Sequence, residues 1–155
     1  MSDYYLNPGL PQPVATPLDE PFWAGLRENR LCVQRCTACA GWQWGPEWIC
    51  HRCLSDALEF ADVAPEGVLY SYERVWHPVH PALAEQGPYL VCLVELLHAD
   101  GVRLVGNLLG DPRREVAIGE RVRGVFEHHD ELRFLQIITP DSHNRERHSQ
   151  RLRHD

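Results

Sequence analysis

The amino-acid sequence predicts a mainly β protein with an N-terminal helix, a zinc ribbon and a small five- to six-stranded OB-fold antiparallel barrel. The ribbon is predicted by four cysteines that form two C-x-x-C pairs. The barrel is predicted by short strand-like segments separated by Gly, Asp and Pro, with no long helix between them. We therefore expect an extended arm (1–15), an amphipathic helix (16–30), the zinc ribbon (31–56), the barrel (57–138) and a disordered tail (139–155).

Composition favours a soluble, cytoplasmic protein. The chain has 155 residues, of which 44% are hydrophobic, and its formal net charge is -7. No stretch approaches the roughly 18 apolar residues of a membrane span, and the opening lacks the basic start and apolar run of a signal peptide. Nucleic acid is disfavoured as a partner, because phosphate binding depends on neutralising Lys and Arg. We expect neither membrane nor nucleic acid to be bound.

The helix is predicted directly after the Pro-rich arm. Thr16 is expected as its N-cap and Pro17 at its first helical position. Four residues form the apolar face: Leu18, Phe22, Trp23 and Leu26. Their spacing is typical of an amphipathic helix, so we expect this face to pack either on the chain itself or on a partner.

The cysteine pairs predict a structural metal site. The four residues are Cys36, Cys39, Cys50 and Cys53, with ten residues between the pairs. This spacing suits two hairpin tips that converge on one tetrahedral ion, and zinc is the expected ion, with rubredoxin-like iron as the alternative. A thioredoxin-like motif uses a single pair. Four thiolates leave no open coordination position, so the zinc should stabilise the fold and not catalyse.

No catalytic residue is predicted. Cys32 and Cys92 lie in strand-like segments and are interpreted as small buried hydrophobic residues. All 15 basic residues are Arg, so chemistry that needs a lysine amine is excluded within the chain. His77 and His80 lie beside prolines in WHPVHPAL. This segment is interpreted either as a rigid loop or as a pair of histidines that faces a cleft.

The barrel strands are read from alternating and apolar segments that turn residues separate. The expected strands are 58–63, 67–76, 89–97, 103–109, 121–127 and 132–138. After residue 138 the chain becomes polar and loses periodicity, which indicates a disordered tail.

The order of these segments resembles a known family. The segments are RCTACAGWQWGPEWICHRC, GVLYSYERVWHPVHPAL, PYLVCLVEL, LVGNLLG and IGERVRGVFE. Together they resemble acyl-CoA-associated proteins that join a rubredoxin-like zinc ribbon to an OB-fold, over roughly residues 16 to 138. Such proteins are accessory subunits of thiolase-superfamily enzymes, including thiolases paired with hydroxymethylglutaryl-CoA synthases, acyltransferases and aldolases that shorten steroid side chains. The resemblance implies a subunit without activity of its own that helps to shape its partner's CoA-ester channel.

The sequence departs from the family at both knuckles. The family commonly has Gly directly after the second Cys of each pair, where Ala40 and Leu54 stand here. That position often takes a positive φ, which costs a residue other than Gly about 1 kcal/mol or more. Gly41 is a possible substitute in the first knuckle, whereas the second has none.

The predicted partner surface is aromatic. Its expected residues are Phe22, Trp23, Trp42, Trp44, Trp48, His77 and His80, since a small ribbon cannot bury three indoles. We expect two copies on a thiolase-fold dimer. Arg27, Arg30, Arg35, His77 and His80 are weak candidates for contact with a CoA ester shared with the partner. The alternative is a zinc-ribbon and OB-fold nucleic-acid binder, which would need a basic groove around the aromatic residues.

Overall fold

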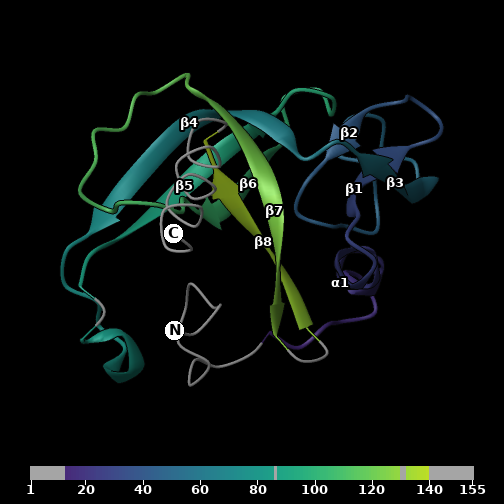
Figure 1. Ribbon diagram of the computed structural model, residues 1–155. Coiled ribbons are helices and arrows are strands. Elements are labelled where there is room, and N and C mark those ends of the chain that lie inside the picture. Colours follow the sequence, from purple (N-terminus) through teal and green to yellow (C-terminus); the bar gives the residue numbers. More distant parts are fainter. Residues whose placement is uncertain (1–12, 86, 130–131, 140–155) are drawn as a thin grey trace, which may run out of the picture.

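The computed structural model describes residues 13–85, 87–129 and 132–139. Figure 1 shows two β-sheets, with a helix packed below the smaller one. The elements are α1 (Glu20–Arg27), β1 (Leu31–Cys36), β2 (Trp42–Gln43), β3 (Leu58–Val63), β4 (Glu66–Val75), the 3-10 helix η1 (Pro81–Leu83), β5 (Tyr89–Leu96), β6 (Arg103–Asn107), β7 (Arg121–His129) and β8 (Leu132–Ile138). The fold is mainly β, as the sequence predicts. The predicted arm and tail lie almost entirely outside the described residues.

The ribbon is a three-stranded antiparallel sheet with the order β2-β1-β3. Strand β3 pairs with β1 along its whole length, from Leu31 opposite Val63 to Cys36 opposite Leu58. The sequence analysis assigned 58–63 to the barrel, and this assignment is wrong. The short segment between β3 and β4 explains the error, because one continuous β pattern runs through two sheets.

The barrel is a five-stranded antiparallel sheet with the order β6-β5-β4-β7-β8. Strand β5 alternates between buried and half-exposed residues along its length, which directs one face into the barrel. Within the described residues, one bridge joins the two edge strands, between Leu108 and Ile137, which pair in parallel. There the amide of Leu109 donates to the carbonyl of Ile137 at 2.7 Å. The barrel is therefore closed at that point and open along the rest of β6.

Two apolar clusters form the core. The first lies inside the barrel and includes Leu69, Leu90 and Leu108. The second joins the two sheets, with Leu31, Val33 and Val63 from the ribbon and Leu96, Ala99 and Leu104 from the barrel region. Burying each Val or Leu side chain contributes about 1.5–3 kcal/mol, so the ribbon and the barrel stabilise one another.

Helix α1 is shorter than the predicted segment 16–30. Its N-cap is Asp19 and not Thr16, because residues 17–19 form a turn ahead of the helix. The Asp19 carboxylate accepts from the Thr16 hydroxyl at 2.7 Å and from Trp23 Nε1 at 3.1 Å. The hydrogen bond from Thr16 is the main cause of the lowered pKa of Asp19. The helix contacts β1 and β8, and so lies between the ribbon and the barrel.

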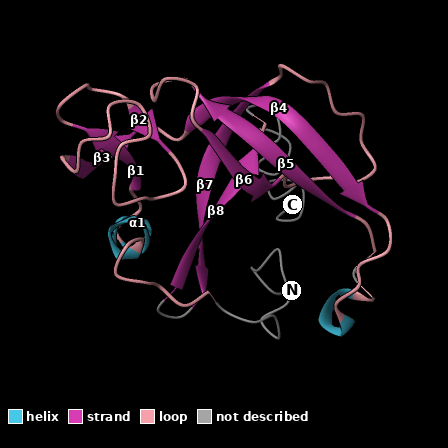
Figure 2. Ribbon diagram, turned by 180° about the vertical axis from the view of Figure 1, so that it is seen from behind, coloured by secondary structure: helices cyan, strands magenta, loops and turns pink. Residues whose placement is uncertain are grey.

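The β4–β5 hairpin carries its connecting loop away from the ribbon. Val75 pairs with Tyr89 at one end of the hairpin, and Gly67 pairs with Leu96 at the other, next to the ribbon. Figures 1 and 2 both show η1, which lies in this loop, on the opposite side of the barrel from β1, β2 and β3.

In the described part of the chain, no helix has the length and apolar character that crossing a membrane requires.

Candidate metal centre and partner surface

The four cysteines of the two knuckles converge. Their sulfur atoms all lie within 4.8 Å of one another. The Sγ atoms of Cys36 and Cys53 are 3.6 Å apart, and those of Cys39 and Cys50 are 3.7 Å apart. A tetrahedral zinc with Zn–S bonds of about 2.3 Å has S···S edges of about 3.8 Å. The donor set and its spacing therefore fit one tetrahedral metal ion.

Backbone geometry at the knuckles explains how this sequence tolerates the missing glycines. Ala40 has φ 60° and Leu54 has φ 62°, so both residues adopt the left-handed conformation that usually favours Gly. Gly41 does not take over the turn from Ala40. Instead, a Cβ atom at Gly41 would lie 2.6 Å from Cδ of Arg52, so Gly41 leaves room for the side chain of the second knuckle.

A buried amide pair holds the two knuckles together. Nε2 of Gln43 donates to Oε1 of Gln34 at 3.0 Å. Gln34 also binds the backbone of Glu47 through both a donor and an acceptor, each at 2.9 Å. Oε1 of Gln43 accepts from the amide of His51 at 3.1 Å. Sequence reasoning missed this network, although Gln34 alternates with Cys32 on a strand and so had to face the same side.

Proton affinities differ among the knuckle thiols. Backbone amides, with that of Cys53 as the largest contributor, lower the pKa of Cys50 to about 6. Cys53 accepts a backbone hydrogen bond from Ser55, which lowers its pKa, but burial and hydrogen bonds with the other three thiols raise it to about 12. The cluster thus favours the thiolate at Cys50 and the protonated thiol at Cys53. A bound cation would replace the proton on Cys53.

The two remaining cysteines are buried, as predicted. Burial is the main cause of the raised pKa of each thiol, to about 11 at Cys32 and about 12 at Cys92. A neutral thiol is a poor nucleophile. Neither residue therefore has the environment of a catalytic cysteine.

Four of the predicted aromatic residues pack against other side chains of the chain. Phe22 lies 4.6 Å from Trp44 and 5.2 Å from Trp23, measured between ring centroids. Trp42 lies under the guanidinium of Arg35, 5.5 Å away. All four rings are partly buried. Helix α1 and the ribbon thus cover most of this aromatic surface themselves.

Trp48 is the ribbon tryptophan that stays open to solvent. Its exposed fraction is 68%, and Ile49 and Leu54 beside the second knuckle are exposed by 52% and 77%. We call these three residues the ribbon tip. Trp48 and Ile49 directly precede Cys50, and Leu54 directly follows the exposed Cys53. Exposed apolar residues are typical of a protein interaction site when they form one patch.

His77 and His80 are not brought near the ribbon. Both lie in the loop that contains η1, and Nδ1 of His80 accepts from the amide of Ala82 at 3.2 Å. An aromatic residue that was not predicted as a site residue lies at the start of the same loop. The ring of Trp76 is 5.6 Å from the guanidinium of Arg74 and 5.5 Å from that of Arg113.

Two of the predicted CoA-binding arginines already have acidic partners. Arg27 pairs with Glu20. Arg30 pairs with Glu28 at 2.7 Å and with Asp62 at 2.5 Å. Their charges are therefore largely neutralised within the chain.

The fold and the cysteine cluster define a protein with a zinc-ribbon domain and an OB-fold domain, in which four cysteines are positioned for metal binding. The family model of the ChsH2 rubredoxin-like zinc ribbon domain matches residues 23–59, and that of the ChsH2 C-terminal OB-fold domain matches residues 61–127. A solved structure, the Ltp2-ChsH2(DUF35) aldolase, contains a chain that is 32% identical, with a TM-score of 0.73. The match covers 83% of this chain and 98% of that one. The chain belongs to the ChsH2 family.

Two further relatives extend the comparison. A protein of Thermomonospora curvata described as a probable enoyl-CoA hydratase alpha subunit is 39% identical over 102 residues, which are 65% of this chain and 31% of the relative. This chain thus spans under a third of that relative's length. A DUF35 protein of unknown function from Sulfolobus solfataricus has a TM-score of 0.58 at 17% identity, covering 81% of this chain and 87% of that one. This last likeness concerns the fold alone.

Proposed function

We propose that the chain is a non-catalytic accessory subunit that binds and stabilises a thiolase-fold acyl-CoA enzyme, either a thiolase or a thiolase-like aldolase, and helps to shape its CoA-ester channel. The observation that carries this proposal is the match to a chain in the solved structure of the Ltp2-ChsH2(DUF35) aldolase, which covers 98% of that matched chain. The segments in which this chain resembles accessory subunits of thiolase-superfamily enzymes point the same way.

The thiols support a subunit without chemistry of its own. We propose that Cys36, Cys39, Cys50 and Cys53 hold one structural zinc, which would leave no coordination position for substrate. Cys32 and Cys92 are buried and have raised pKa values. The reacting groups would then come from the partner.

The ribbon tip supports protein docking. Trp48, Ile49 and Leu54 are exposed although they are apolar, and truncating such residues at the centre of an interface typically costs about 2 kcal/mol or more. Phe22, Trp23, Trp42 and Trp44 would contribute through their partly exposed edges. A two-fold symmetric partner offers each site twice, so two copies would bind one dimer.

A CoA ester would be held mainly by the partner. Arg27 and Arg30 are engaged by carboxylates, and Arg35 lies over Trp42. This leaves His77 and His80 as the candidates with which the chain would reach the channel, from the loop at the far end of the hairpin.

Co-expression with a thiolase-fold protein from the same organism tests the proposal. We expect a stoichiometric complex whose acyl-CoA activity is lost when this chain is omitted. Ile49→Ser should weaken co-purification and activity together, by about thirtyfold in affinity if it removes about 2 kcal/mol. Ile118→Ser is the matched control, since Ile118 is 61% exposed on the barrel region. A partner that is fully active alone and never co-purifies would refute the proposal.

A further inference from the structure

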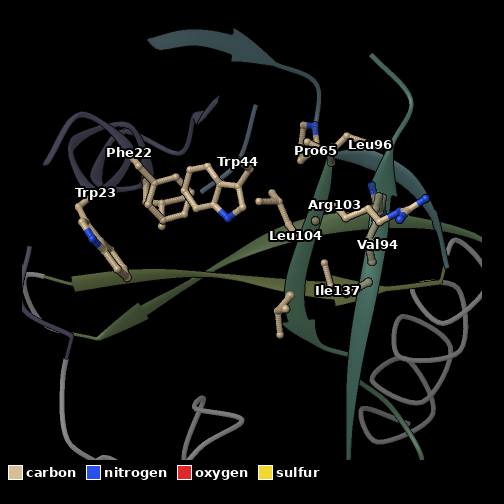
Figure 3. Close-up of a pocket in the computed structure, with 13 residues that line it drawn as sticks. Phe22, Trp23, Trp44, Pro65, Val94, Leu96, Arg103, Leu104 and Ile137 are labelled. Atoms are coloured by element: carbon tan, nitrogen blue, oxygen red, sulfur yellow. The ribbon is translucent and has the colours of Figure 1, made fainter. Parts of the chain in front are cut away.

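An apolar cavity of about 290 Å³ lies where α1, the ribbon and the barrel meet. Figure 3 shows Phe22 and Trp44 on one side of it and Leu104, Val94 and Ile137 on the other. These residues come from a helix, a ribbon loop and three barrel strands. The function proposed above gives Phe22 and Trp44 a partner contact through their exposed edges, but it assigns no role to the cavity itself.

The barrel topology explains why the cavity exists. Strand β6 is an edge strand, and the barrel closes only at the bridge between Leu108 and Ile137. Along the remainder of β6, α1 and Trp44 cover the opening without filling it. The contact between Phe22 and Trp44, with centroids 4.6 Å apart, fixes one wall. The cluster that joins ribbon and barrel fixes the other through Leu96 and Leu104.

Two arginines line this otherwise apolar space, and they differ in their partners. The guanidinium of Arg103 pairs with Glu95 at 3.0 Å and lies 3.6 Å from the ring centroid of Tyr70. For Arg123, by contrast, the described residues provide no ion pair and no side-chain hydrogen bond. An arginine at the wall of an apolar cavity favours a carboxylate, which it can bind through two parallel hydrogen bonds.

We propose that this cavity is a binding site for a small amphiphile with a short apolar chain that ends in a carboxylate. The apolar chain replaces water against Phe22, Trp44 and Leu104, which is favourable at about 25 cal/mol per Å² of buried apolar surface. The carboxylate pairs with Arg123 at the mouth. Ligand pockets generally combine an apolar lining with a few polar groups that fix orientation, and this cavity has that composition.

Decanoate brominated at its terminal carbon is the first probe, because bromine quenches tryptophan fluorescence on contact. We expect saturable quenching of the isolated chain by this compound. Trp44→Phe should remove much of the quenching, whereas Trp48→Phe should leave it unchanged, since Trp48 lies at the ribbon tip outside the cavity. Quenching that rises without saturation, or that depends on Trp48 and not on Trp44, would show nonspecific adsorption and overturn the proposal.

Calorimetric titration with decanoate and decanol tests the role of the charge. Arg123→Gln should weaken decanoate binding roughly fivefold and leave decanol binding unchanged. Arg121→Gln is the control, as Arg121 lies two residues away on β7 but does not line the cavity. Equal affinities for both compounds, with no effect of Arg123→Gln, would refute a carboxylate site. The assays need no partner, so their failure would leave the proposed subunit role standing.

Discussion

Nε2 of Gln43 donates to Oε1 of Gln34 across the ribbon at 3.0 Å, and both side chains are buried. This bond links β1 to β2. Because the same two amides also hold the backbone of Glu47 and His51, the second knuckle depends on them for its position.

Replacing Gln34 with Leu should therefore loosen the second knuckle. The change removes the partner of both the amide and the carbonyl of Glu47. It also leaves Nε2 of Gln43 with only a long hydrogen bond to the carbonyl of Ile49, at 3.4 Å. An unsatisfied buried group costs about 1–3 kcal/mol. We expect a lower free energy of unfolding in urea and faster loss of metal to a chelator. Arg35→Leu, at the exposed neighbouring position, should change metal release little. Equal release rates for the two variants would contradict the assigned role.

Removal of the metal should destabilise the barrel as well as the ribbon. One zinc per chain is expected by elemental analysis, and structural zinc supplies roughly 10 kcal/mol or more in comparable small sites. Cys36→Ser and Cys50→Ser should lose the metal and unfold the ribbon. Since Leu31 and Val33 share a cluster with Leu104, the thermal midpoint of the barrel should fall with it. Cys92→Ala should retain one zinc, and a metal-free chain with an unchanged midpoint would disprove this coupling.

Glycine at the second knuckle should stabilise the protein. Leu54 has φ 62°, a conformation that costs about 1–2 kcal/mol for a residue with a side chain. Glycine removes this cost, but it loses more conformational entropy on folding, which offsets roughly 0.5–1 kcal/mol of the gain. Leu54→Gly should thus raise the free energy of unfolding by about 0.5 kcal/mol. Leu97→Gly, at an exposed position without positive φ, should lower it. A loss of stability in both variants would mean that the Leu54 backbone carries no strain.

Cys92 should make the folded chain less stable at high pH. Burial raises the pKa of its thiol from 9.0 to about 12, so between these values the unfolded thiol ionises while the folded one keeps its proton. Unfolding then releases a proton, and the free energy of unfolding falls as pH rises above about 9. Cys92→Ala removes this ionisation. The free energy of unfolding, measured in urea, should be lower for Cys92→Ala than for the parent at about pH 8, and this difference should shrink by about pH 11. A difference that stays constant would show that the thiol ionises equally in the folded and unfolded states.

The isolated chain should not turn over acyl-CoA esters. The thiols of Cys32 and Cys92 are buried and have raised pKa values, and the loop between β4 and η1, which contains His77, lies on the opposite side of the barrel from β1, β2 and β3 (Figure 1). Assays with ketoacyl-CoA and hydroxyacyl-CoA esters, with and without the partner, check this expectation. Turnover by the chain alone that survived both Cys92→Ala and His77→Ala would require a catalytic group that is not recognised above.

Local patterns in the sequence were sufficient for the strands and for the metal cluster. The predicted segments 58–63, 89–97 and 132–138 match β3, β5 and β8 closely, because alternation and turn residues act over a few neighbours. The cysteine spacing likewise reports a local hairpin geometry. Sequence patterns did not show which sheet β3 joins, since that depends on pairing with β1 more than twenty residues earlier.

The remaining features depend on contacts between distant segments. The Gln34–Gln43 pair forms only when β1 and β2 meet, and the cavity forms only when α1 covers the open side of the barrel. The late start of α1 had a local cause that sequence reasoning missed, because the N-cap is Asp19 and not Thr16. The prediction of a single partner surface assumed that the WHPVHPAL loop lies close to the helix and the ribbon. Sequence patterns do not report such distances between segments.

The β4–β5 hairpin separates the ribbon from the loop around His77 and His80. Strand β4 has 10 residues, which at about 3.3 Å each span roughly 30 Å. One end of this strand follows the ribbon strand β3, and its other end leads into the loop around His77 and His80, so the strand separates these two regions by about its own length. A partner that touches both must offer a face of that width, or else the two subunits of a dimer must each receive one end.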